Sequence, residues 1–372
     1  MAAGGAAGGA THAGRAGGAA GQARRHRQLS RCCRRRGTGQ HVRHQRAGGA
    51  TRRRAGDATG RHRTTDRGHG IVNLQAHIVG QLPAAGGLWP RLRACAELTR
   101  PRVVLLVAAA TAAAYLLSEQ QPLRGYRFIQ TVLATALVAA GAGAVNQYME
   151  RAADALMKRT ACRPLPAGVI APAAALGLGL VCIAGGTAWL AMCAGAAALP
   201  AAFAAVVYLL AYTPLKRISA ASTLIGAVAG AMPALVGCWA GAGALTPAGT
   251  AMFIIIFLWQ MPHFLAIAII HAEDYARAGF RMLTSCPGGV RAAGRQMVLY
   301  SLALVPAVLL PAAQGLAGAC YTGAALAACA AMVLASLRCA RRPEKDTASA
   351  VLAMSVLHLG VVMSALVLDA SR

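Results

Sequence analysis

The chain has 372 residues, of which 57% are hydrophobic and 13% are charged, and its mean hydropathy is +0.51. That much apolar sequence exceeds the need of a single soluble core and indicates an integral membrane protein. The formal net charge of +26 does not indicate a nucleic-acid-binding protein, because beyond residue 90 the basic residues lie mostly at the ends of apolar segments, where they set membrane orientation.

The eleven cysteines are scattered along the chain, and no Cys-x-x-Cys pair occurs. Several lie inside apolar runs, where cysteine behaves as a small hydrophobic residue. The sequence therefore indicates neither a disulfide framework nor a zinc site.

Residues 1–88 form a Gly-, Ala- and Arg-rich tail with few large apolar residues, and we expect this tail to be disordered. Three interpretations are open. A nucleic-acid-binding function is disfavoured because the tail lacks aromatic residues for base stacking. An organelle transit peptide is disfavoured because Ser30 is the only serine within residues 1–88. We favour translation from upstream of the true start. The tail has no apolar centre of a secretory signal, and the membrane domain is expected over residues 89–372.

Nine apolar segments follow, each long enough to cross or nearly cross a bilayer at about 20 residues per helix. Abundant Gly and Ala favour close packing between these helices. The expected fold is all-α, a polytopic membrane protein built as a nine-transmembrane-helix bundle. Its segments are 103–118, 128–146, 170–188, 194–212, 221–240, 249–269, 296–313, 317–337 and 350–368.

The connectors between these segments alternate in charge. Lys and Arg occur after the second, fourth, sixth and eighth segments and are absent after the third, fifth and seventh; the first connector has only Arg124 and Arg127. The positive-inside rule then places the N-terminus and the even-numbered connectors in the cytoplasm, and the C-terminus outside.

A polar stretch directly after the second segment contains Asn146, Glu150 and Asp154, spaced four residues apart. If the helix continues, the three side chains lie on one face. An amide and two carboxylates are oxygen ligands that suit Mg²⁺, which takes one or two carboxylates plus substrate phosphates. The alternative is an ordinary solvated loop, which explains Arg151 or Lys158 alone equally well.

Two further polar clusters lie on the same predicted side. Lys216 and Arg217 follow the fourth segment, where such a pair can bind phosphate but is more often a topological anchor. Asp274 follows the sixth segment, so a second acidic group is available to hold a second metal ion. His263 and His271 nearby, and His358 in the ninth segment, are more often structural than ligands.

This combination points to ionisation of a lipid diphosphate at a membrane-embedded site. Mg²⁺ and basic residues neutralise the leaving diphosphate, a nucleophilic acceptor attacks the allylic cation, and the membrane helices house the isoprenoid tail. A transporter is disfavoured, because the charges lie at one membrane face and no convincing internal repeat occurs.

The stretch Asn146–Leu165, with the pattern N-x-x-x-E-R-x-x-D-x-x-M-x-R-T-x-x-R-P-L, resembles the first aspartate-rich motif of UbiA-type intramembrane prenyltransferases. The segments LTRPRVV, YTPLKR, GAVAGAMPALVG and EDYARAGFRML are similar to the heme O synthase branch of that superfamily, and the resemblance covers roughly residues 92–368. The sequence departs from the superfamily pattern at Ala278, where a second acid would complete a motif begun by Asp274.

The resemblance implies a central cavity open to the cytoplasm and farnesyl transfer from farnesyl diphosphate to a heme b vinyl group, giving heme O. Another aromatic or tetrapyrrole acceptor is the alternative. It also implies a bacterial inner membrane rather than a mitochondrial one, and a heme A synthase acting downstream. The implied Mg²⁺ ligands and catalytic residues are Asn146, Glu150, Asp154 and Asp274, and the implied diphosphate-binding residues are Lys158, Arg159, Arg163, Lys216 and Arg217.

Overall fold

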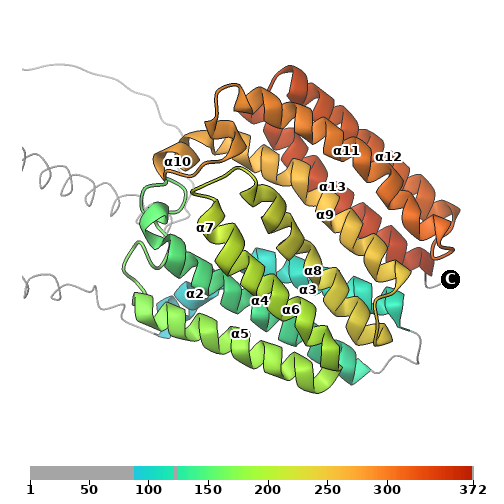
Figure 1. Cartoon of the computed structure of the whole chain (residues 1–372), viewed down its shortest axis with the longest axis horizontal. Helices are drawn as coiled ribbons and strands as arrows, with labels where there is room; N and C mark the ends of the chain where they lie inside the picture. The colour runs from blue at the N-terminus through green and yellow to red at the C-terminus, as the bar shows by residue number, and fades with distance from the viewer. Residues whose placement is uncertain (1–87, 120–124, 371–372) are drawn as a thin grey trace, which may run out of the picture. The chain divides into compact units, whose positions relative to one another are not determined.

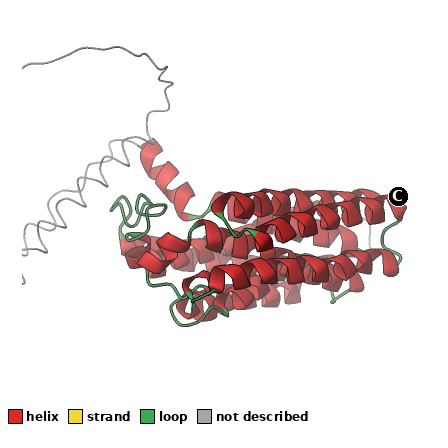
Figure 2. Cartoon of the chain, turned by 90° about the horizontal axis from the view of Figure 1, so that it is seen from above, coloured by secondary structure: helices red, strands yellow, loops and turns green. Residues whose placement is uncertain are grey.

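The computed structural model describes residues 88–119 and 125–370, and these residues are helical with no strand (Figures 1 and 2). Apart from Leu88, the predicted tail lies outside the described residues. The helices are α2 (Leu88–Leu98), α3 (Pro101–Ser118), α4 (Gly125–Asp154), α5 (Pro172–Ala194), α6 (Ala198–Val206), α7 (Thr213–Leu215), α8 (Ser222–Ala242), α9 (Pro247–Ile270), α10 (Ala272–Arg277), α11 (Gly289–Ala313), α12 (Ala319–Arg341) and α13 (Lys345–Ala370).

Eight continuous helical runs within the described residues are long and apolar enough to cross a membrane. One of them, Pro172–Leu215, has 44 residues and would measure roughly 66 Å if straight, about twice the thickness of a bilayer core. It is not straight, because α5 ends at Gly195 with a φ of 58° and α6 runs back beside α5 (Figure 1). Counting this hairpin as two passes confirms the predicted bundle of nine helices within the described part of the chain.

Helix α4 continues past the predicted end of its span at residue 146 and ends at Asp154. The extension keeps Asn146, Glu150 and Asp154 in one helix, so the predicted stacking on one face is confirmed. Glycines bring α5 close to this helix. A Cβ atom on Gly141 of α4 would lie 2.6 Å from the Gly179 carbonyl oxygen of α5, so the two backbones approach at a distance that only glycine permits.

The largest buried cluster lies in the other half of the bundle, where α9 packs against α8, α11 and α13. Met252, Ile255 and Trp259 of α9 belong to it, together with Leu304 of α11 and Tyr321 of α12. This core fixes the position of α9, and α9 leads directly into α10 at one end of the bundle (Figure 1).

The even-numbered connectors meet at that same end. The Arg281 amide donates to the Lys216 carbonyl oxygen at 2.8 Å, and the Lys158 amide donates to Asp274 Oδ1 at 3.2 Å. Lys345, after the eighth predicted segment, donates to Glu273 at 3.2 Å. The alternation of the connectors is therefore confirmed, whereas the side of the membrane that this end faces stays a prediction.

Candidate active site

The end of α4 presents its polar face inward. Asn146, Glu150 and Asp154 are at most 5% exposed, whereas Arg151 on the opposite face is exposed. Buried carboxylates are costly unless they are paired, and each of the two has a cationic partner. The face is thus a built polar network, and the interpretation as an ordinary solvated loop is wrong for these three residues.

Asn146 is held by two elements distant in the sequence. Its Oδ1 accepts a 2.7 Å hydrogen bond from Arg100 Nη2, and its Nδ2 donates to Thr213 Oγ1 at 2.9 Å. Thr213 Oγ1 in turn donates to the Tyr208 carbonyl oxygen at 2.7 Å, across a π-helical segment (Val207–Tyr212) that precedes α7. The amide orientation is therefore fixed by α4, by the α2–α3 junction and by α7.

Arg100 lies at the junction of α2 and α3 in the left-handed backbone region, with a φ of 54°, and is the only non-glycine residue with positive φ in the described part of the chain. Gln147 holds this junction against α4 by donating to the Leu98 carbonyl oxygen at 2.7 Å. Burial acts to lower the pKa of Arg100, but Tyr208 and Glu150 act to raise it, and its pKa is raised overall. The guanidinium therefore stays charged.

Glu150 pairs with Lys216, whose Nζ lies 2.7 Å from Glu150 Oε1. Arg100 Nη2 lies 4.0 Å from the other carboxylate oxygen. The Lys216 ammonium also lies 4.2 Å from the centroid of the Tyr212 ring, within cation–π range. Two cations thus flank one buried carboxylate and concentrate positive charge at this end of the bundle.

Asp154 pairs with Arg163 from the connector between α4 and α5. Arg163 Nη1 donates to both carboxylate oxygens, at 2.9 and 2.7 Å. Burial lowers the pKa of Arg163, and the nearby charge of Arg100 acts in the same direction, whereas Asp154 opposes both. Arg163 belongs to the same cluster of positive charge as Arg100.

Asp274 forms a separate pair in α10. Its Oδ1 accepts from Arg277 Nη2 at 2.9 Å as well as from the Lys158 amide. Burial raises the pKa of the adjacent Tyr275, and Arg159 acts against that rise. Arg159 also acts to lower the pKa of Arg163, so this exposed cation influences both Arg163 and Tyr275.

The predicted site residues therefore fall into three groups. The first lies at the end of α4, where Arg100 links Asn146 to the Glu150–Lys216 pair, and Asp154 pairs with Arg163 one turn further along. The second is Asp274, which is connected to the α4–α5 connector through the Lys158 amide. The side chains of Lys158, Arg159 and Arg217 are exposed and take no part in the ion pairs found among residues 92–119 and 125–369.

The oxygen atoms of Asn146, Glu150 and Asp154 are the hard donors that Mg²⁺ prefers. The described residues contain no group of three or more His, Cys, Asp or Glu side chains able to hold a metal ion. The donor set fits Mg²⁺ because an amide oxygen and substrate phosphate oxygens, in addition to two carboxylates, complete the coordination that this ion requires.

Sequence reasoning did not assign roles to Arg100, Tyr208 and Thr213. The signals for Arg100 were its position directly before the proline that begins a membrane helix and its place in the segment LTRPRVV. His263 was expected to be a hydrogen-bonded structural residue rather than a ligand. Its contacts agree with that expectation, because its Nδ1 lies 2.8 Å from Ser355 Oγ and its ring centroid lies 5.2 Å from that of the buried Trp259.

The sequence of the chain is similar to those of known proteins. The model of the UbiA prenyltransferase family matches residues 105–359. The chain is 38% identical over 284 residues to the protoheme IX farnesyltransferase of Solibacter usitatus (strain Ellin6076), which covers 73% of this chain and 97% of that protein.

Two solved structures share the fold at lower sequence identity. One, described as a digeranylgeranylglyceryl phosphate synthase, has a TM-score of 0.62 and 19% identity and covers 76% of this chain and 99% of its own. The other is a UbiA homolog from Archaeoglobus fulgidus bound to DMAPP and Mg²⁺, with a TM-score of 0.55 and 16% identity, covering 73% and 98%. By the family match over most of its helical bundle and by the relative that it covers almost completely, the chain belongs to the UbiA prenyltransferase family.

Proposed function

We propose that this prenyltransferase joins farnesyl diphosphate to heme b (protoheme IX) and produces heme O. The observation that carries the proposal is the buried face of α4, where an amide and two carboxylates each contact a basic side chain. The name of the Solibacter usitatus relative supports the choice of farnesyl group and heme.

The ion pairs of the site are suited to exchange. The side chain of Lys216 is 12% exposed and that of Arg163 is 24% exposed, whereas the carboxylates that they contact are nearly inaccessible. A diphosphate arriving at this end can take Lys216 and Arg163 as partners, and Arg100 adds a third cation. The basic residues then stabilise the negative charge that develops on the leaving group.

The resident metal ion would be Mg²⁺, which the Archaeoglobus fulgidus homolog binds together with its substrate. Asn146, Glu150 and Asp154 would hold the ion once their cationic partners turn to the phosphates, and Asp274 would serve a second ion. The metal would neutralise the leaving diphosphate. Thr213 and Arg100 keep the Asn146 amide oriented for this role.

The exposed cations act before the reaction. Lys158, Arg159 and Arg217 stand at the same end of the bundle and attract the diphosphate toward the buried network. Their solvent exposure makes each contribution small and sensitive to salt.

In the reaction the bond between the farnesyl C1 carbon and the diphosphate oxygen breaks. The terminal carbon of a heme vinyl group forms the new carbon–carbon bond, water supplies a hydroxyl group to the neighbouring carbon, and a proton leaves to solvent. The apolar helices exclude bulk water from the isoprenoid chain and align the two substrates.

We place the enzyme in a bacterial inner membrane with its N-terminus and active site at the cytoplasmic face, open to a central cavity. Heme O is released there for a heme A synthase. The basic connectors at the active-site end support this orientation.

The test uses membranes that contain the full chain, supplied with heme b, farnesyl diphosphate and Mg²⁺. Heme O is detected by mass-resolved chromatography, with EDTA as the metal control and residues 89–372 as a second preparation. Metal-dependent heme O is the expected result. A folded, inserted protein that consumes farnesyl diphosphate but leaves heme b unchanged would refute heme as the acceptor and favour another aromatic or tetrapyrrole acceptor.

A further inference from the structure

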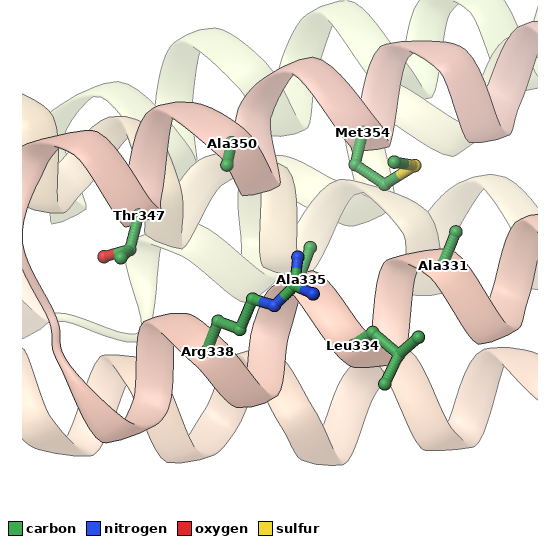
Figure 3. A pocket seen from close by; sticks show the side chains of 7 residues that line it. All are labelled: Ala331, Leu334, Ala335, Arg338, Thr347, Ala350 and Met354. Carbon is green, nitrogen blue, oxygen red and sulfur yellow. The ribbon is translucent and has the colours of Figure 1, made fainter.

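A groove lies between α12 and α13, and none of the residues of the candidate active site lines it (Figure 3). On α12 its lining residues are spaced by three and four, and on α13 they follow the same spacing, so each helix contributes one face. It encloses about 260 Å³. The groove is lined by Ala331, Leu334, Ala335, Arg338, Thr347, Ala350 and Met354.

The groove exists because three of its positions are alanine. The two helices pack through larger buried side chains elsewhere, including Met332 and Val351, while Ala331, Ala335 and Ala350 leave the surface hollow. Its volume is below the roughly 300–1,000 Å³ of typical small-molecule sites. A segment of a single alkyl chain fits this space, and a heme does not.

One end of the groove carries positive charge. Arg338 lies in the last turn of α12, and Figure 3 shows its side chain reaching back along the helix toward Ala335, away from the helix end. Lys345 is paired with Glu273, and the Thr347 hydroxyl donates to the Arg342 carbonyl oxygen at 2.6 Å. Arg338 is therefore the lining residue with a charged group available to a ligand.

The neighbouring charges favour an anion at this end. Arg338, Arg341 and Arg342 bring three positive charges to this end, and the exposed carboxylates of Glu344 and Asp346 offset two of them. A guanidinium directed toward the apolar part of a membrane helix is costly without an anionic partner. A phosphate group meets this need through two parallel hydrogen bonds.

We propose that the groove binds one acyl chain of an anionic phospholipid, whose phosphate pairs with Arg338. From Arg338 toward Ala331 the α12 residues that line the groove are all apolar, so the acyl chain lies along Ala335, Ala331 and Leu334. The span from Arg338 to Ala331 is seven residues, about 10 Å of helix, and receives the part of the chain nearest the headgroup. A lipid bound there would join α12 to α13 next to the contact between Lys345 and Glu273.

The test is native mass spectrometry of the full chain, purified in detergent with equal amounts of phosphatidylglycerol and phosphatidylcholine that carry the same acyl chains. The wild-type chain should retain one phosphatidylglycerol preferentially. Arg338→Gln should lower that retention roughly tenfold, equivalent to about 1.4 kcal/mol. Arg342→Gln is the matched control, because it removes an exposed arginine from the same end but outside the groove, and it should leave retention within twofold of wild type.

A second pair of variants tests the hollow itself. Ala350→Leu and Ala331→Leu each fill the groove with an apolar side chain and should reduce retention of phosphatidylglycerol by a similar factor without lowering Tm. Equal retention of the two lipids by the wild-type chain would overturn the proposal. Equal loss in Arg338→Gln and Arg342→Gln would also overturn it, since that result indicates general attraction of anionic lipid to a basic surface.

Discussion

Replacing Asp154 by Asn separates the structural role of this carboxylate from its chemical role. Asn keeps the size of the side chain and an oxygen that accepts a hydrogen bond from Arg163, but it removes the negative charge. A hydrogen bond to a charged group contributes about 1.5–3 kcal/mol and a neutral one about 0.5–1.5 kcal/mol. Because the Arg163 side chain is 24% exposed and can turn to water, we expect a loss of stability of about 1–2 kcal/mol.

The loss of activity should be much larger than this. If Asp154 holds the metal that neutralises the diphosphate, removing its charge should lower kcat about 10²–10³-fold, equivalent to about 2.7–4 kcal/mol of transition-state stabilisation. The assay measures the initial rate of heme O formation over a range of Mg²⁺ concentrations, together with Tm in detergent. Raising Mg²⁺ should restore part of the rate.

Asp346→Asn is the matched control, because Asp346 is an exposed carboxylate near the same end of the bundle. We expect wild-type rate and Tm from it. A Tm lowered as predicted together with more than half of the wild-type rate in Asp154→Asn would refute the role of this carboxylate in metal binding, and would leave Asp154 as a structural partner of Arg163.

Three other measurements test the site and the fold. Lys216→Met should raise KM for farnesyl diphosphate about tenfold or more and lower kcat, because the largely buried cation next to Glu150 is lost. Arg217→Met, at an exposed position, should change the rate less than threefold and mainly at low salt. Equal effects of the two variants would contradict the assignment of Lys216 to diphosphate binding. Gly141→Ala should destabilise the bundle by about 1–3 kcal/mol, because its Cβ meets the backbone of α5, while Gly177→Ala, with open space around its Cβ, should be neutral or stabilising in the same thermal unfolding assay. Burial lowers the pKa of His271, so the unfolded chain takes up a proton more readily than the folded one. The contribution of the neutral His271 to folding stability is therefore present above the ordinary pKa of about 6.5 and falls as pH decreases. His271→Gln should flatten the decrease of Tm between pH 7 and pH 5.

Local spacing predicted the face of α4 correctly, because the positions of Asn146, Glu150 and Asp154 depend only on the helical repeat. The contacts of that face could not be predicted in the same way. Arg100 precedes Asn146 by 46 residues and meets it only because α2 and α3 fold against α4. The pairing of Asp274 with the backbone amide of Lys158 was likewise hidden, since reasoning from side-chain charge does not identify a peptide N–H group as the partner.

The hairpin in residues 172–215 shows a second limit. The third predicted segment ends at residue 188, shortly after Gly185 and Gly186, but α5 continues to Ala194 and the chain reverses at Gly195. Gly186 serves packing instead, because a Cβ there would lie 2.8 Å from Val138 Cγ2 of α4. A glycine that permits a turn and a glycine that permits close approach look alike in a sequence, and only the position of the neighbouring helix distinguishes them.

The left-handed backbone of Arg100 affects how substitutions at this position would be interpreted. A non-glycine residue in that conformation costs about 1 kcal/mol, which Arg100→Gly would recover. The same exchange removes the guanidinium that orients Asn146. A survey that ranks variants by expression level or heat resistance would therefore score this substitution as benign or favourable, although the variant has lost part of the candidate active site.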